Sequence, residues 1–112
     1  MKLLKCVVRT SALDEVKEAL SKLGIAGMTV SEVKGFGRQK GHKEMYRGAE
    51  YNIDFTPKLE VEVVVSDELA GDAINAVKDA ASTGNIGDGK ILSIPVDDVV
   101  RIRTGETGDA AI

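Results

Sequence analysis

The chain contains 112 residues, which suits one ordinary domain and is too short for two. Apolar residues make up 43% and charged residues 29%, a globular composition that excludes a disordered chain. The net charge of -3 argues against nucleic acid as a partner, because a phosphate backbone requires a cationic surplus. The single cysteine, Cys6, excludes an internal disulfide and multi-cysteine zinc patterns. Without a recognisable targeting segment, we expect one cytoplasmic domain over residues 1–112.

The hydrophobic periodicity predicts two helices and at least four strands. Strands are expected over residues 3–9, 28–34, 59–65 and 91–96, with a short fifth over 98–103. The first helix is expected to begin with a capping box formed by Ser11 and Asp14 and to end at Gly24. The second is expected to begin at Asp67 and Glu68. This order predicts an α+β, ferredoxin-like βαββαβ fold, in which two helices cover one face of a four-stranded antiparallel sheet.

The sheet face opposite the helices is expected to carry aliphatic side chains. In the third predicted strand this face includes Val64 beside acidic residues. In the first strand the pattern leaves two sets open, Cys6 with Val8 or Leu3 with Val7. Because either choice leaves aliphatic side chains uncovered, we expect oligomerisation through this face.

A long connection separates the second and third predicted strands. Residues 35–57 exceed the roughly 12–15 residues beyond which a structureless connection is usually functional or disordered. The segment combines basic side chains with Tyr46 and Tyr51, and Arg and Tyr are common in interface hot spots. A mobile, solvated loop and a docking loop are both compatible with this pattern.

Residues 83–90 (TGNIGDGK) contain the glycine spacing and lysine of a P-loop. The hydroxyl residue that a P-loop needs for magnesium is replaced by Ile91, and a strand is expected to follow in place of a helix. Glycines still allow backbone amides to converge on a phosphate, and Lys90 adds charge. Arg101 and Arg103 would share one face of the predicted fifth strand and favour an oxyanion. A plain glycine-rich turn is the alternative.

No catalytic grouping emerges from the sequence. His42, the one histidine, falls in the long connection, and Cys6 is expected to be a buried, inert thiol. The pattern offers neither a Ser-His or Cys-His pair nor a metal-ligand set, and we expect that the protein is not an enzyme.

Four segments match one known pattern: residues 29–42 (TVSEVKGFGRQKGH), 46–51 (YRGAEY), 83–91 (TGNIGDGKI) and 101–106 (RIRTGE). Together they resemble the PII nitrogen-regulatory signal-transduction proteins of the GlnB/GlnK type. The resemblance extends over essentially the whole chain without insertions. It implies a homotrimer of ferredoxin-like subunits, with a T-loop at about 37–55, a B-loop at about 82–90 and a C-terminal segment at about 101–112.

The resemblance further implies that ATP or ADP binds in clefts between subunits, and that 2-oxoglutarate joins Mg2+ and ATP there. The implied nucleotide-binding residues are Thr29, Gly35, Gly37, Arg38, Glu62, Val64, Gly87, Asp88, Gly89, Lys90, Arg101 and Arg103, the last two from a neighbouring subunit. The implied 2-oxoglutarate-binding residues are Gln39, Lys40, Gly41 and Lys58. Gln39 would also be a ligand of Mg2+, for which oxygen ligands are suited.

The same resemblance implies a regulator of partner proteins. The expected partners are an ammonium transporter, a nucleotidyltransferase acting on glutamine synthetase, or a sensor kinase, so that membranes would be reached only through a partner channel. Arg47 would enter the pore of the channel, and Tyr51 matches a tyrosine that is uridylylated or adenylylated in some relatives.

The chain departs from the family's common Lys-Pro-Phe-Lys at residues 9–12 (RTSA), which border the expected effector pocket. An adenylate sensor without a 2-oxoglutarate response is therefore the first alternative. A slow ATPase that uses the same phosphate cradle and a structural trimer with a vestigial pocket are the others.

Overall fold

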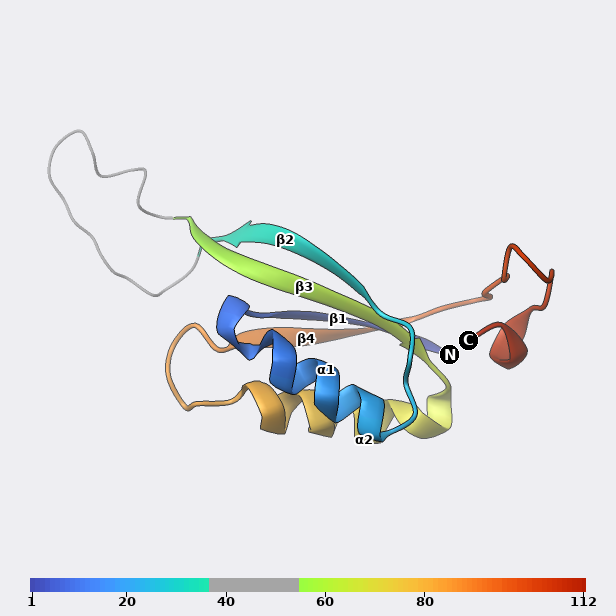
Figure 1. The fold of residues 1–112 in the computed structure, drawn as a ribbon, viewed down its shortest axis with the longest axis horizontal. Coiled ribbons are helices and arrows are strands. Elements are labelled where there is room, and N and C mark those ends of the chain that lie inside the picture. The colour runs from blue at the N-terminus through green and yellow to red at the C-terminus, as the bar shows by residue number, and fades with distance from the viewer. Residues whose placement is uncertain (37–54) are drawn as a thin grey trace, which may run out of the picture.

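The computed structural model describes residues 1–36 and 55–112. The main elements are β1 (Lys2–Arg9), α1 (Leu13–Lys22), β2 (Thr29–Gly35), β3 (Thr56–Val65), α2 (Asp67–Ala81) and β4 (Gly89–Pro95). Short 3-10 helices occur at Thr10–Ala12 and Gly108–Ala111. The order of the main elements confirms the predicted βαββαβ sequence (Figure 1).

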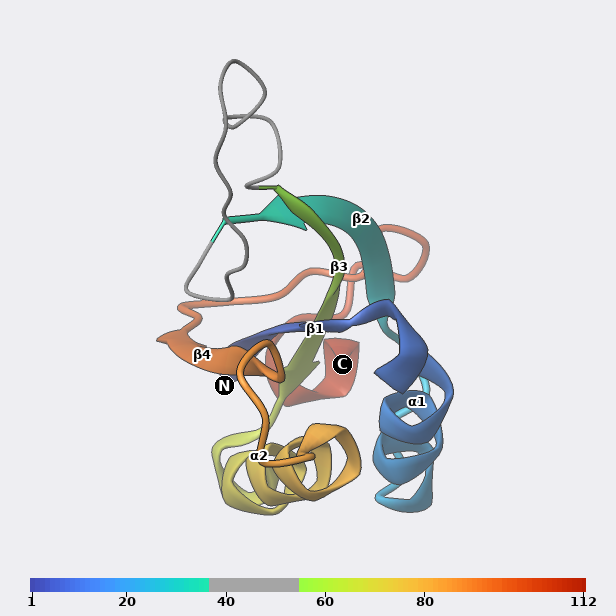
Figure 2. The ribbon, with the colours of Figure 1, turned by 90° about the vertical axis from the view of Figure 1, so that its left-hand side faces the viewer.

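The four strands form one antiparallel sheet in the order β2-β3-β1-β4. Both helices lie on the same side of this sheet, and no element of residues 1–36 or 55–112 covers the central part of the other side (Figure 2). This arrangement confirms the predicted ferredoxin-like fold. The side without helices is called the open face below.

The alternation of burial along β1 decides which side chains face the helices. Leu4, Cys6 and Val8 are buried in the core, whereas Leu3 and Val7 fall on the open face. The helices bury their own apolar stripes against these side chains, including Val16 and Leu20 of α1 and Ala73 and Val77 of α2. Burial raises the pKa of the Cys6 thiol to about 11, which keeps the thiol neutral and unreactive.

The strand register aligns the open-face side chains in rows across the sheet. One row contains Thr29, Glu62, Lys5 and Leu92, and the next contains Ser31, Glu60, Val7 and Lys90. An apolar row is formed by Val64, Leu3 and Ile94. Lys5 Nζ lies 3.7 Å from a carboxylate oxygen of both Glu60 and Glu62. The open face thus combines aliphatic side chains with a small charged network.

Both predicted helices are present, but the predicted start of the first is wrong. Ser11 lies in the 3-10 turn before α1, and Ala12 occupies the N-cap without a side-chain hydrogen bond. The Ser11 hydroxyl instead accepts a hydrogen bond from Arg9. The predicted stop at Gly24 is confirmed, because its φ of +84° suits glycine and its amide donates to the carbonyl of Ser21.

The predicted fifth strand over residues 98–103 is also wrong. This segment folds back on itself, with a single bridge between Val100 and Thr107. Asp98 Oδ1 accepts hydrogen bonds from the amides of Val99 and Gly108, so its carboxylate stabilises a loop in preference to an extended strand. The third and fourth strands also begin earlier than predicted, at Thr56 and Gly89.

Ser66→Ala is expected to lower the free energy of unfolding by about 1 kcal/mol. Ser66 is the N-cap of α2, and its hydroxyl accepts a hydrogen bond of 3.3 Å from the amide of Leu69. Urea unfolding followed by circular dichroism would measure the loss. Ser21→Ala on the exposed side of α1 makes the same chemical change without removing a cap, and it should raise stability by a few tenths of a kcal/mol.

In the described part of the chain, no helix is long and apolar enough to cross a membrane.

Candidate functional site: a glycine-rich loop and the open face of the sheet

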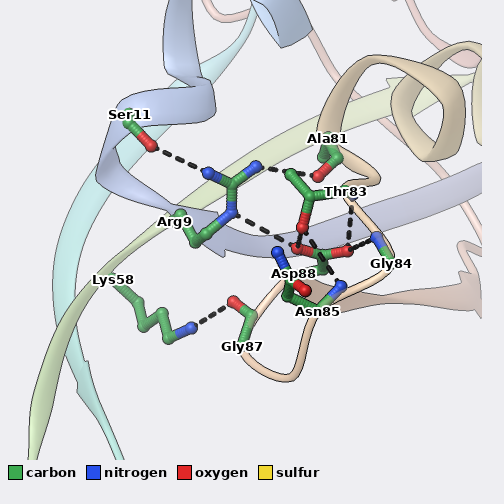
Figure 3. A network of polar contacts seen from close by, with 9 residues as sticks. All are labelled: Arg9, Ser11, Lys58, Ala81, Thr83, Gly84, Asn85, Gly87 and Asp88. Atoms are coloured by element: carbon green, nitrogen blue, oxygen red, sulfur yellow. Dashed lines mark hydrogen bonds and ion pairs between the residues drawn. The ribbon is translucent and has the colours of Figure 1, made fainter.

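The glycine-rich loop, defined here as residues 82–88, connects the end of α2 to the start of β4. Its shape depends on the Asp88 carboxylate, which accepts hydrogen bonds from within the same loop. Oδ2 accepts from the amides of Thr83 at 2.7 Å and Gly84 at 2.9 Å, and Oδ1 accepts from the Thr83 hydroxyl at 2.5 Å (Figure 3). The hydrogen bond from the Thr83 hydroxyl lowers the pKa of Asp88, so this carboxylate is ionised at neutral pH.

The loop is also attached to the sheet by Lys58 of β3. Lys58 Nζ donates a hydrogen bond of 2.5 Å to the carbonyl of Gly87, and the side chain is only 8% exposed. A buried ammonium group needs such an acceptor, because an unpaired one would be costly to desolvate. The predicted site residues Lys58 and Gly87 are therefore in direct contact.

Gly89 is where the loop joins the sheet. Its φ is +109°, and a Cβ built on it would lie 1.8 Å from the carbonyl oxygen of Val7. Only glycine allows β4 to begin this close to β1. Lys90 follows directly and is exposed on the open face, in register with Val7. Gly89 thus fixes the position of Lys90, the second residue of β4.

Arg9 contacts this loop, although the sequence pattern did not place it among the expected binding residues. It is paired with Lys58 in the β1–β3 register, so the two cationic side chains lie side by side. Its guanidinium donates to the carbonyl of Ala81 at 3.0 Å and to the Ser11 hydroxyl at 2.9 Å. Its Nε lies 3.5 Å from Asp88 Oδ1. The sequence signal that could have indicated Arg9 was the departure of residues 9–12 from the family's common Lys-Pro-Phe-Lys.

Three of the implied nucleotide-binding residues, Thr29, Glu62 and Val64, lie together on the open face. Thr29 is in register with Glu62, and Val64 falls on the same face of β3 two residues further along. Gly35, at the end of β2, packs against Lys58, since a Cβ there would lie 3.3 Å from Lys58 Cγ. Thr29, Glu62 and Val64 thus share one region of the open face, whereas Gly35 and Lys58 lie toward the other end of the β2–β3 pair.

Arg101 and Arg103 do not share a strand face, but both line one groove of about 920 Å3 that also includes Val64. Arg101 is tied to its own segment through Glu106, 3.9 Å away. Asp88, Gly89 and Lys90 line a different groove of about 400 Å3. Figure 1 shows the glycine-rich loop and the C-terminal segment at opposite ends of the sheet, so one copy of the chain does not bring the two sets together.

The remaining predicted site residues, which all come from the long connection, lie outside the described residues. They are Gly37, Arg38, Gln39, Lys40, Gly41, Arg47 and Tyr51. Among the residues that the structure describes, no group of three or more His, Cys, Asp or Glu side chains could hold a metal ion.

The sequence that forms this sheet and glycine-rich loop matches a regulatory family. The family model described as "Nitrogen regulatory protein P-II" matches residues 1–106. The chain is 60% identical to the nitrogen regulatory protein P-II of Azospirillum brasilense and 59% identical to that of Rhizobium meliloti (strain 1021). It is 54% identical to the nitrogen regulatory protein P-II 1 of Escherichia coli (strain K12). Each match extends over 112 residues and covers 100% of both chains.

The chain therefore belongs to the P-II family of nitrogen regulatory proteins. Its role is in signalling, and it is not an enzyme. The resemblance found in the sequence is confirmed.

Proposed function

We propose that the protein is a homotrimeric sensor that binds ATP or ADP in clefts between its subunits. The observation that carries this proposal is the separation of Lys90 from Arg101 and Arg103 within one copy. These cations would converge on one triphosphate only if a second copy supplied its C-terminal segment. The uncovered aliphatic side chains of the open face give the copies an apolar surface through which to associate.

The glycine-rich loop is suited to the phosphates. Within the described residues, the amides of Ile86 and Gly87 donate no hydrogen bond to another residue, and Lys90 is exposed beside them. Arg38 and Gly37 would complete the phosphate contacts. Gly35, which has no side chain, would allow the nucleotide to approach the backbone closely. Thr29, Glu62 and Val64 would line the adenine pocket on the open face.

We place 2-oxoglutarate near Lys58, whose ammonium group would pair with a carboxylate of the effector. Gln39 would be a ligand of Mg2+ beside ATP, and Lys40 and Gly41 would contact the keto acid. Oxygen ligands of this kind suit magnesium, which would join the nucleotide to the effector. Binding at the base of the long connection would then change the surface that partners contact.

The partners we propose are those of cytoplasmic nitrogen control: an ammonium transporter, a nucleotidyltransferase or a sensor kinase. Arg47 would contact the channel, and Tyr51 would be the site of uridylylation or adenylylation. Both residues lie in the expected T-loop at about 37–55.

Calorimetric titration of ATP with Mg2+, with and without 2-oxoglutarate, tests the proposed ligands. Mutual tightening of ATP and 2-oxoglutarate is the expected result, because coupling between two ligands is reciprocal. ATP binding that is indifferent to 2-oxoglutarate would favour the adenylate-only sensor. One observation supports that alternative: Lys58 is already bonded to Gly87 in the free chain, so the effector would have to displace this contact. No ATP or ADP binding at all would overturn the proposal.

Lys90→Gln is expected to weaken ATP binding about 10- to 100-fold, since a hydrogen bond to a charged group contributes roughly 1.5–3 kcal/mol. Lys90 is exposed, so the fold should not change. Titration of the variant with ATP would measure the loss. Lys17→Gln on the exposed side of α1 removes the same charge away from the site, and an equal loss in that control would show a general charge effect.

A further inference from the structure

Asp88 is an unexpected residue in a phosphate-binding loop, because a carboxylate repels a phosphate. The structure resolves this conflict by turning the carboxylate into the loop, where three donors of Thr83 and Gly84 bind it. The guanidinium of Arg9 lies against the same carboxylate and offsets its charge. The negative charge of Asp88 is therefore compensated by hydrogen-bond donors within the loop and by Arg9.

Arg9 connects the turn that follows β1 to the end of α2 and the glycine-rich loop, which lie more than 70 residues further along the chain. Figure 3 shows its guanidinium between Ser11, the end of α2 and the glycine-rich loop. One nitrogen, Nη2, binds the carbonyl of Ala81, the last residue of α2, and Nη1 binds the Ser11 hydroxyl. A planar guanidinium can donate in several directions at once, whereas a lysine ammonium is a compact point charge on a flexible stem.

The position of Nε adds a further indication. This atom is buried and has no hydrogen-bond partner within the described residues, and Asp88 Oδ1 lies 3.5 Å away. A buried donor without a partner is unfavourable, so any small approach of Asp88 would be stabilised. Arg9 thus holds the loop from the side of the sheet, and Lys58 holds it at Gly87.

We infer that Arg9 is a positioning residue for the glycine-rich loop. Arg9 acts on this loop through Asp88 and the end of α2, and it does not touch the nucleotide. The inference rests on the proposed nucleotide binding and deepens it. It assigns Asp88 two separate parts: its backbone belongs to the phosphate cradle, and its side chain holds the loop in shape. Thr83 is the matching donor within the loop.

A double-mutant cycle with Arg9→Gln and Asp88→Asn separates positioning from direct contact. Arg9→Gln alone is expected to weaken ATP binding about tenfold. In the Asp88→Asn background the same change should cost less than threefold, because the loop has already lost the carboxylate through which Arg9 acts. A loss from Arg9→Gln that is equal in both backgrounds would show that Arg9 does not act through Asp88, and it would overturn the inference.

Amide hydrogen exchange of the free protein, measured by nuclear magnetic resonance, tests the same inference without any ligand. In Arg9→Gln the amides of Thr83 and Gly84 should exchange at least tenfold faster, while the core amides of Val61 and Val63 stay unchanged. Unchanged exchange at Thr83 and Gly84 would overturn the inference even if ATP binds. If the wild type fails to bind ATP, the proposed function fails, and the exchange rates still decide the role of Arg9.

Two further variants serve as a conservative substitution and as a charge control. Arg9→Lys retains the charge beside Asp88 and should partly restore slow exchange, and it serves as the test if Arg9→Gln does not fold. Lys17→Gln removes a charge from the exposed side of α1 and should leave both exchange and ATP affinity within twofold of the wild type. Exchange in Arg9→Lys as slow as in the wild type would contradict the need for a planar guanidinium.

Discussion

Gly89→Ala is expected to lower the free energy of unfolding by about 2–5 kcal/mol. Two costs combine at this position. The φ of +109° is unfavourable for any residue with a Cβ, and the added Cβ would lie 1.8 Å from the carbonyl oxygen of Val7. The backbone of β1 cannot move aside cheaply, because the same segment of β1 is also paired with β3.

The matched control for this change is Gly71→Ala. Gly71 lies within α2, and a Cβ built on it would contact no atom within 4 Å. Alanine is a better helix former than glycine, so this variant should be more stable by about 0.5–1 kcal/mol. Urea unfolding of both variants at one protein concentration would measure the difference, since association shifts apparent stability. Equal stability of Gly89→Ala and the wild type would show that β4 can begin elsewhere.

The sequence predicts the regular elements well because each has a local cause. The alternation of Leu59, Val61, Val63 and Val65 follows the burial of β3, and Gly24 ends α1 with the left-handed backbone that was expected. The sequence-based predictions fail where a polar side chain has a second possible hydrogen-bond partner. Ser11 binds Arg9 in place of a helix amide, and Asp98 binds the amide of Gly108 from a distant turn.

The candidate site shows the same contrast between features that have a local cause and contacts that only the folded chain creates. The motifs around Lys90 and Thr29 contain residues that lie next to the glycine-rich loop and on the open face in the structure. Arg9 was not among them, because its partners Ala81 and Asp88 come near it only through the pairing of β1 with β4 and the packing of α2. A contact between residues this far apart in the sequence has no local pattern from which it could be predicted.

Leu3→Glu is expected to convert the proposed trimer into single folded chains. Leu3 lies in the apolar row of the open face, between Val64 and Ile94, and Ile94 is 37% exposed in the single chain. If copies associate through this face, the row becomes buried, and each trimer would then contain three carboxylates without partners. Burial of an unpaired carboxylate costs several kcal/mol, so association should fail at micromolar concentration.

Light scattering coupled to gel filtration would measure the expected threefold drop in mass, and circular dichroism would confirm that Leu3→Glu still folds. The fold should persist because Leu3 lies on the side of β1 away from the core. Asn75→Glu adds one negative charge to the exposed surface of α2 and should retain the wild-type mass. A trimer that survives Leu3→Glu would place the contact between copies elsewhere. ATP binding offers a second readout: if Arg101 and Arg103 come from a neighbouring copy, the single chains should also lose affinity for ATP.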